Sequence, residues 1–354
     1  MRGELSYIFD IKKVFIIGAG FSKPAGLPLT SELLPLVHQK ATEKEYSNSD
    51  GVIPMGQAVM LLEELRYYFP LLNVTHNNII HGRLGRHINL EKFLSFLAAE
   101  STFLSTSDRF NEHGSKLLAF IKQWIGEVIY ERQIKHFKNI PDFYNVFIKQ
   151  LCNSLILTFN WDTLIETLLD FQNIKYRYQL NVEDFDERRN SIPLLKLHGS
   201  INWFSTDNYY DDKENSGKFT NLGYGFKSIE KQEGDLRIRF NNYQSPWIVV
   251  PNYDKLIQLK EYGELWETPW RYLDDKLEII FIGFGFRKDD FHARGFIYPK
   301  LVQGSRNGNY SVKVVDFAAN ESDRKKIKNR FKGIENCKFW LDGFNLESLN
   351  FIFN

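Results

Sequence analysis

Residues 12–28, KKVFIIGAGFSKPAGLP, combine an apolar run with a glycine turn. The apolar run covers residues 14–17, and Gly18, Ala19 and Gly20 end it ahead of a segment that reads as a helix. Glycine lets the backbone N–H groups of a tight turn approach a phosphate, and the positive end of a helix dipole favours the same anion. The pattern therefore indicates a strand that ends at the pyrophosphate of a dinucleotide. Such a turn also occurs as plain loop geometry, so the motif by itself leaves a structural role open.

Polar side chains follow two later apolar runs. Asn160 and Asp162 come directly after residues 154–158, and His198 comes directly after residues 193–197. An unperturbed histidine takes up a proton near neutral pH, which suits a general base. The structural alternatives are also concrete, because Asn and Asp are preferred N-caps for a helix beginning near residue 161. A lone histidine at a strand end often serves only the fold.

Strand-like runs and helical patterns alternate along the chain. This order predicts an α/β fold, with a Rossmann-like, mostly parallel sheet and helices on both faces. The candidate residues lie at the carboxyl ends of predicted strands, where doubly wound sheets bind their ligands. The predicted strands cover residues 13–17, 154–158, 193–197, 247–250, 277–282 and 311–315.

The segment between the first two strands reads as helical. Apolar residues recur there at i, i+3, i+4 and i+7, a spacing that puts them on one helix face. We predict a single domain over residues 1–354, in which a discontinuous core of residues 10–45 and 151–354 receives a helical insertion at residues 46–150. The apolar positions behind this prediction are Leu90, Phe93, Leu94, Leu97, Leu117, Phe120, Ile121, Trp124 and Val128.

Composition bounds the kind of protein. With 354 residues, 43% of them hydrophobic, the chain can bury a large core. Its net charge of +1 creates no global field, so direct nucleic-acid binding is not expected, and the basic run at residues 324–330 is most simply the solvated face of a helix.

Cys152 and Cys337 lie far apart and form no C-x-x-C pair, which argues against a metal site. The chain has no long uncharged apolar stretch, so we expect no membrane span and a cytoplasmic location.

Four short motifs, in order along the chain, resemble those of the sirtuin-like family. The first is GAGFSKPAGLP, which extends the glycine turn with Phe21, Ser22 and Pro28. The four motifs are spread over most of the chain, so their joint match is specific although each is short. The other three are TFNWD at residues 158–162, LHGS at residues 197–200 and FIGFGF at residues 281–286.

The resemblance implies NAD as the bound molecule and no metal. It implies that Asn160 holds a water or a ribose hydroxyl, that Asp162 receives the nicotinamide amide, and that His198 is the general base. Asp316, at the end of a late strand, is implied to accept a hydrogen bond from the adenosine ribose, which favours NAD over NADP. The remaining residues implied to contact NAD are Gly18, Ala19, Gly20, Phe21, Ser22, Pro28, Gly283 and Gly285.

Two departures separate this chain from the deacylating sirtuins. Those enzymes carry a four-cysteine zinc module after the H-G motif, whereas residues 199–300 contain no cysteine. They also follow the first motif with Phe-Arg, where this chain has Leu29 and Thr30. The chain resembles instead the zinc-free, sirtuin-like NAD hydrolases of bacterial anti-phage defence, including their helical insertion with a helix around Glu91. The implied activity is an NAD hydrolase (NADase) that cleaves the nicotinamide–ribose bond with water and releases nicotinamide and ADP-ribose.

Other functions stay open on the sequence. The main alternative is a non-catalytic NAD- or ADP-ribose-binding sensor or scaffold, and NAD-dependent deacylase or ADP-ribosyltransferase activity is less favoured. Uncontrolled NAD hydrolysis would kill the host, and the core and insertion use nearly the whole chain, so we expect control by assembly. The expected form is a homo-oligomer built through the insertion and activated by a separate regulatory protein such as an ATPase or a nuclease.

Overall fold

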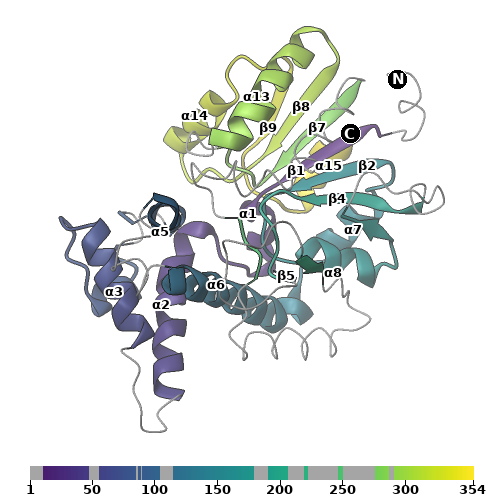
Figure 1. Cartoon of the computed structure of the whole chain (residues 1–354). Coiled ribbons are helices and arrows are strands. Elements are labelled where there is room, and N and C mark those ends of the chain that lie inside the picture. The colour runs from purple at the N-terminus through teal and green to yellow at the C-terminus, as the bar shows by residue number, and fades with distance from the viewer. Residues whose placement is uncertain are drawn as a thin grey trace.

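The computed structural model describes residues 11–47, 56–84, 87–88, 90–103, 115–178, 190–205, 219–221, 246–249, 276–286 and 291–354. Within these residues, a seven-stranded sheet has the order β3-β4-β2-β1-β7-β8-β9, and its neighbouring strands are parallel (Figure 1). A separate antiparallel pair is formed by β5 (Trp203–Ser205) and β6 (Phe219–Asn221). The strands of the large sheet are β1 (Lys13–Ile17), β2 (Ser154–Thr158), β3 (Tyr176–Arg177), β4 (Ile192–Lys196), β7 (Leu277–Ile282), β8 (Tyr310–Val315) and β9 (Cys337–Trp340).

The strand order locates the ligand-binding edge of this sheet. The chain runs outward from β1 to β2 and β4 on one side, and then from β7 to β8 and β9 on the other. This is the doubly wound Rossmann order, and its direction reverses between β1 and β7. Ligands of such sheets bind at that switch point, outside the carboxyl ends of the strands. The predicted α/β, Rossmann-like fold is therefore confirmed.

Apolar side chains alternate between the two faces of the sheet, and helices cover both faces. Val14 and Ile16 of β1 pack into one buried cluster, whereas Phe15 and Ile17 pack into another. Strands with apolar residues on both faces are typical of a buried parallel sheet. The first cluster is closed by α13 (Phe291–Arg306) and α14 (Glu321–Arg330), and the second by α7 (Phe143–Lys149), α8 (Leu164–Phe171) and α15 (Leu346–Phe353).

A helical part of the chain lies beside the sheet (Figure 1). It consists of α2 (Thr30–Ser47), α3 (Gln57–Tyr68), α4 (His76–Ile80), α5 (Leu90–Phe103) and α6 (Ser115–His136). The short helices α1 (Ala19–Ser22) and η1 (Lys23–Ala25) lead from β1 into α2, which packs against α6. Leu34 and Val37 of α2 share a buried cluster with Trp124 of α6. Helix α2 therefore joins the helical part to the sheet, while the domain boundaries at 45/46 and 150/151 stay predictions.

Most predicted strands lie where the apolar runs put them, although β4 is shifted by one residue and β8 begins one residue earlier. The stretch 247–250 is the exception, because Ile248 forms only an isolated bridge with Gly199 among the described residues, and residue 250 lies outside them. Helix α8 starts at Leu164 with Thr163 as its N-cap, so the helix start expected near residue 161 is wrong.

Two glycine turns touch each other at the switch point. The N–H of Gly20 donates a hydrogen bond to the carbonyl of Gly283 at 2.9 Å. A Cβ atom on Gly18 would lie 2.6 Å from the Cα of Phe284, and one on Gly20 would lie 2.6 Å from the Cα of Gly283. Gly283 has a φ of +59°, and a Cβ there would lie 2.2 Å from the backbone nitrogen of Phe21. The contact between the turns therefore requires these glycines before any ligand is considered.

Gly283→Ala is expected to lower the free energy of unfolding by about 2–5 kcal/mol, from the left-handed backbone and the overpacked contact together. Gly308→Ala is the matched control, because Gly308 has a φ of +70° but nothing lies within 4 Å of its added Cβ. In the control variant, the free energy of unfolding should fall only by the backbone contribution of about 1–2 kcal/mol. Urea denaturation followed by circular dichroism measures both, and equal losses would contradict the described contact.

Candidate functional site

A cavity of about 710 Å³ opens at the switch point, between the carboxyl ends of the strands and the helical part. Its volume is in the range of pockets that bind small molecules and cofactors. The structure therefore brings residues from distant parts of the sequence to one place. The predicted site residues that line the cavity are Gly18, Ala19, Gly20, Pro28, Asn160, Asp162, His198, Gly283, Gly285 and Asp316.

Phe21 and Ser22 lie behind the wall of this cavity. Phe21 is fully buried, and its ring packs against Tyr144 and Phe344 with centroids 5.2 and 4.9 Å away. Ser22 is buried as well, and its Oγ accepts a hydrogen bond from Asn160. This placement does not favour the direct ligand contacts expected of Phe21 and Ser22. It favours support, since Phe21 anchors the glycine turn and Ser22 holds Asn160.

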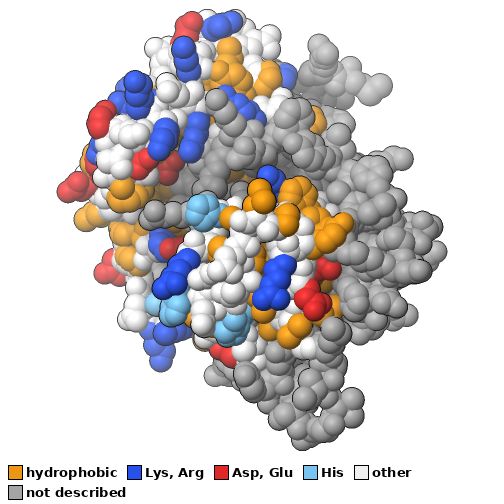
Figure 2. Space-filling model, turned by 90° about the vertical axis from the view of Figure 1, so that its left-hand side faces the viewer, with side chains coloured by type: hydrophobic (Ala, Val, Ile, Leu, Met, Phe, Trp, Pro, Cys, Tyr) orange, Lys and Arg blue, Asp and Glu red, His pale blue; other side chains and the backbone are white. Residues whose placement is uncertain are grey.

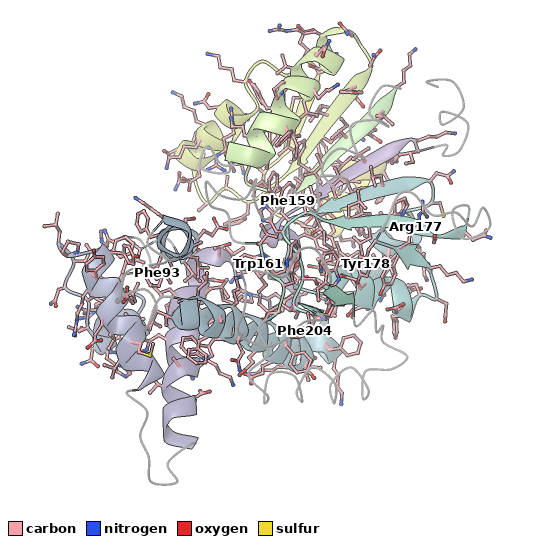
Figure 3. The ribbon with its side chains drawn as sticks, in the orientation of Figure 1. Phe93, Phe159, Trp161, Arg177, Tyr178 and Phe204 are labelled. Carbon is pink, nitrogen blue, oxygen red and sulfur yellow. The ribbon has the colours of Figure 1, made fainter. Side chains whose placement is uncertain are left out.

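The turn between β2 and α8 directs its side chains into different parts of the molecule. Phe159 packs into the cluster of the sheet that α13 and α14 cover, and Trp161 packs into the cluster of the helical part. Figure 3 shows Phe159 where the strands end and Trp161 between the sheet and the helical part. The polar residues of the turn, Asn160 and Asp162, face the cavity. The turn is therefore held from both sides.

Asn160 connects this turn to the first glycine turn. Its Nδ2 donates to the carbonyl of Gly18 and to Oγ of Ser22, both at 3.1 Å. An amide nitrogen carries two hydrogens, so both are used and Oδ1 is the atom left for a ligand. Because α8 starts only at Leu164, Asn160 is not its N-cap.

His198 comes from the end of β4 and is held by aromatic rings. Its imidazole meets Phe159 edge to face, with ring centroids 4.8 Å apart. Phe159 stacks in turn on Phe284 at 4.2 Å, so the three rings connect the ends of β4, β2 and β7. Gly199 follows with a φ of +74°, which turns the chain sharply after the imidazole. A histidine positioned in this way suits proton transfer at one defined place in the cavity.

Asp162 supplies a carboxylate to the same wall and is 9% exposed. Burial raises the pKa of Asp162, while the positive charge of Lys196 and hydrogen bonds from the Leu164 N–H and Ser22 act in the opposite direction. The N–H of Leu164 donates to Oδ1 at 3.0 Å. Asp162 therefore satisfies the first turn of α8 and also lies on the cavity wall, so the capping interpretation and the ligand interpretation are compatible for this residue.

The β8 end of the cavity carries charged and aromatic side chains. Asp316 directly follows β8, and its Oδ1 accepts a hydrogen bond from the N–H of Phe317 at 2.8 Å. Phe317 is 69% exposed, so its ring presents an apolar surface at the mouth of the cavity. Lys326 and Arg330 reach the cavity from α14, which belongs to the upper part of the molecule where Lys and Arg side chains gather in Figure 2. Arg330 also donates to the carbonyl of Gly285 at 2.6 Å and thereby holds the second glycine turn.

The helical part closes the cavity on its other side. Leu33 of α2, Glu91 of α5 and Ile129 of α6 line the cavity together with the glycine turns. Glu91 lies on the helix that the resemblance emphasises, and the structure brings its side chain to the cavity. A change in the packing of these helices would therefore change the shape of the cavity.

Sequence reasoning missed several side chains that support the site. Lys196 ends an otherwise apolar strand, and a charged residue in such a strand is the signal that marks it. Gln133 lies within α6, and its Nε2 donates to the hydroxyls of Thr163 and Thr167 at 2.9 and 3.0 Å. Arg330 belongs to the basic run interpreted as a solvated helix face. No local pattern reveals Gln133, because its partners lie on a different helix.

The cavity has the polar groups that a dinucleotide needs at separate places along its wall. The glycine turns lie in the middle, Asn160, Asp162 and His198 lie at the ends of β2 and β4, and Asp316 lies at the end of β8. Among the described residues, no group of three or more His, Cys, Asp or Glu is placed to hold a metal ion. Within the same part of the chain, no helix is long and apolar enough to cross a bilayer.

A family model described as a SIR2-like domain matches residues 154–297. The matched range begins with β2 and contains Asn160, Asp162 and His198. This part of the chain is therefore similar to a SIR2-like domain, from a family that uses NAD, and the Rossmann-like sheet agrees with that similarity. No curated protein matches the chain. The first glycine turn and Asp316 lie outside the matched range, so the structural support for their roles is their place in the cavity.

Proposed function

We propose that this protein is an NAD hydrolase that cleaves the nicotinamide–ribose bond with water and gives nicotinamide and ADP-ribose. Asn160, Asp162 and His198 line the same cavity as the two glycine turns, and this shared lining carries the proposal. Backbone N–H groups suit a pyrophosphate, and a carboxylate, an amide oxygen and an imidazole suit the cleavage of an N-glycosidic bond beside it. No metal is needed for this chemistry.

In the proposed reaction, each residue has a separate task. Asp162 accepts a hydrogen bond from the nicotinamide amide and so orients the leaving group. The bond from C1′ to the nicotinamide nitrogen lengthens, its electron pair leaves with nicotinamide, and the ribose becomes oxocarbenium-like. Asn160 accepts a hydrogen bond from the attacking water through Oδ1, and His198 removes a proton from this water as its oxygen bonds to C1′. Nicotinamide leaves neutral, and His198 passes the proton to solvent.

The β8 end of the cavity favours NAD over NADP. In the proposed complex, Asp316 accepts a hydrogen bond from a ribose hydroxyl and would repel a 2′-phosphate, and its position on the cavity wall supports this role. Of the two cations at this end, Arg330 donates to the Gly285 carbonyl and Lys326 forms an exposed pair with Asp323 at 3.1 Å. The exposed ring of Phe317 offers a surface on which adenine can stack.

A non-catalytic NAD- or ADP-ribose-binding module is the second candidate. The observation that favours it is the structural task of Asn160, whose amide hydrogens bond the first glycine turn. Nicotinamide release from NAD by the purified protein, measured beside NAD binding by calorimetry, separates the two candidates. Binding without release at any protein concentration would favour the module.

We further propose that the enzyme acts in the cytoplasm as a homo-oligomeric effector of anti-phage defence, whose NAD depletion is triggered by a separate regulatory protein such as an ATPase or a nuclease. The helical part supports this control, because Leu33, Glu91 and Ile129 line the cavity and assembly through their helices would act on the site directly. The same part carries exposed apolar side chains, with Tyr67 58% and Leu71 98% exposed. Such side chains are typical of protein contacts when they gather on one surface.

His198→Ala is expected to lower nicotinamide release by about 10²- to 10⁴-fold, because the variant lacks the general base. Circular dichroism should show an unchanged secondary structure, and calorimetry should show that NAD still binds. His81→Ala is the matched control, since His81 is exposed and does not line the cavity. A His198→Ala variant that hydrolyses NAD at the parental rate would remove this residue from the mechanism.

Asn160→Ala is expected to abolish turnover while NAD binding stays measurable, because the glycine turns hold the phosphates. The variant also loses two buried hydrogen bonds, so its free energy of unfolding should fall by about 1–3 kcal/mol. Asn145→Ala is the control, because Asn145 bonds Gln172 at 3.0 Å outside the cavity. Nicotinamide assays and urea denaturation measure both effects. Full activity combined with lower stability would make Asn160 a purely structural residue.

The double variant Tyr67→Glu, Leu71→Glu is expected to break the oligomer and to change the rate of NAD hydrolysis, because it places charges on the proposed contact surface. Phe171→Glu is the control, since Phe171 is 55% exposed but lies on α8, outside the helical part. Size-exclusion chromatography with light scattering, run beside an NADase assay, gives both readouts. A parental monomer at micromolar concentration with full activity and no partner would refute control by assembly.

A further inference from the structure

A buried ion pair lies directly behind the nicotinamide end of the cavity. The Nζ atom of Lys196 is 2.7 Å from Oε1 of Glu166, and the two side chains are 0% and 2% exposed. Nζ also donates to the backbone carbonyl of Asp162 at 2.5 Å. Tyr178 completes the group by donating its hydroxyl hydrogen to Oε1 of Glu166 at 3.2 Å. Neither Lys196 nor Glu166 lines the cavity, and the reaction described above uses neither.

A contribution to the stability of the fold does not by itself explain why this ion pair is present. The residues of β4 before Lys196 are apolar and buried, so an apolar side chain would fit the strand pattern. Removing two charges from water is costly, and apolar replacements of a buried pair are often neutral or stabilising. A buried ammonium group at the end of this strand therefore calls for a task other than packing.

The location of Lys196 indicates that task. Lys196 is the last residue of β4 and precedes His198 by two positions. Its hydrogen bond to the Asp162 carbonyl connects β4 to the turn that carries Asn160 and Asp162. The charged and titratable groups acting on the Asp162 carboxylate are Lys196 of β4, Glu166 of α8 and Tyr144 of α7, and Ser22 of α1 adds a hydrogen bond. Lys196 is the cation of this set, and its positive charge opposes the effect of burial on the pKa of Asp162.

We propose that Lys196 is a positioning residue of the nicotinamide end: its ammonium group fixes the backbone at Asp162 and thereby holds the Asp162 carboxylate in place as an acceptor for the carboxamide of nicotinamide. The role of the carboxamide rests on the proposed NAD hydrolase function. Glu166 neutralises the charge of the Lys196 ammonium group and orients this group, and Tyr178 orients Glu166. The site then extends one layer below the cavity wall, into the contact between β4 and α8.

The most informative variant removes the charges of both Lys196 and Glu166. Lys196→Met alone would leave Glu166 as an unpaired buried anion and is expected to fold poorly. The double variant Lys196→Met, Glu166→Gln keeps the volumes similar and leaves no charge to bury. The matched control is Lys313→Met, Glu278→Gln, because Lys313 pairs with Glu278 at 2.6 Å and donates to the Ile352 carbonyl at 2.9 Å. This second pair reproduces the bonding pattern on β7 and β8 without lining the cavity.

Loss of Lys196 is expected to raise the pKa of Asp162, because the attraction that favours the anion is lost and burial remains. The ¹³C signal of the Asp162 carboxyl, assigned with Asp162→Asn, should therefore titrate at a higher pH in the Lys196→Met, Glu166→Gln variant and not in the control. Glu166→Gln alone should move the titration to lower pH, since it removes a repelling anion. Shifts of opposite sign would establish that both charges act on the Asp162 carboxylate, and the NAD-binding measurements below then distinguish a positioning role from a purely structural one.

Activity gives a second readout. In the Lys196 double variant, KM for NAD should rise by about 10- to 100-fold, as for a lost charged hydrogen bond, and the acid limb of the kcat/KM profile should move to higher pH. An Asp162 titration that stays in place, or one that moves while KM and NAD affinity stay parental, would overturn the role of Lys196. If the parental protein binds NAD without releasing nicotinamide, the hydrolase proposal fails. The NMR titration and the NAD affinities then still decide the role of Lys196.

Discussion

The contact between two glycine turns, at the point where the sheet reverses direction, is the constraint on which the rest of the site depends. The backbones after β1 and β7 approach so closely that a Cβ on Gly18, Gly20 or Gly283 would lie 2.2–2.6 Å from a backbone atom of the other turn. Only residues without a side chain permit this approach. The absence of side chains at these glycines also leaves their backbone open to the cavity. The fold and the proposed pyrophosphate site therefore require glycine at the same positions.

The turn from residue 159 to residue 163 transmits this arrangement to the rest of the molecule. Phe159 and Trp161 are buried in different clusters, Asn160 bonds the first glycine turn, and Thr163 is held by Gln133 of α6. The helical part therefore contacts the turn that carries the proposed reaction residues. These direct contacts give a physical route by which the proposed assembly through the helical part could change the site.

The strands and the site residues at their ends were largely predictable. Long apolar runs that end in glycine or polar residues indicate buried parallel strands, and the carboxyl ends of such strands meet at one edge of the sheet. Asn160, Asp162, His198 and Asp316 follow from that rule and do line one cavity. The supporting residues were harder to predict. Lys196 lies within the predicted strand at residues 193–197, and Arg330 lies within the basic run interpreted as a solvated helix face.

The sequence by itself determined the order of the strands along the chain and the glycines at their ends, because apolar periodicity and backbone freedom are local properties of the residues. Only the tertiary structure decided which side chains turn inward. Phe21 and Ser22 lie behind the cavity wall, α8 starts later than its capping residues suggest, and Lys196 finds its partners on α8 and in the turn before it. Each of these outcomes depends on partners that are distant in sequence, as with Lys196 and Glu166, 30 residues apart. A buried polar group takes the partner that the fold brings within hydrogen-bonding distance, whatever its place in the chain.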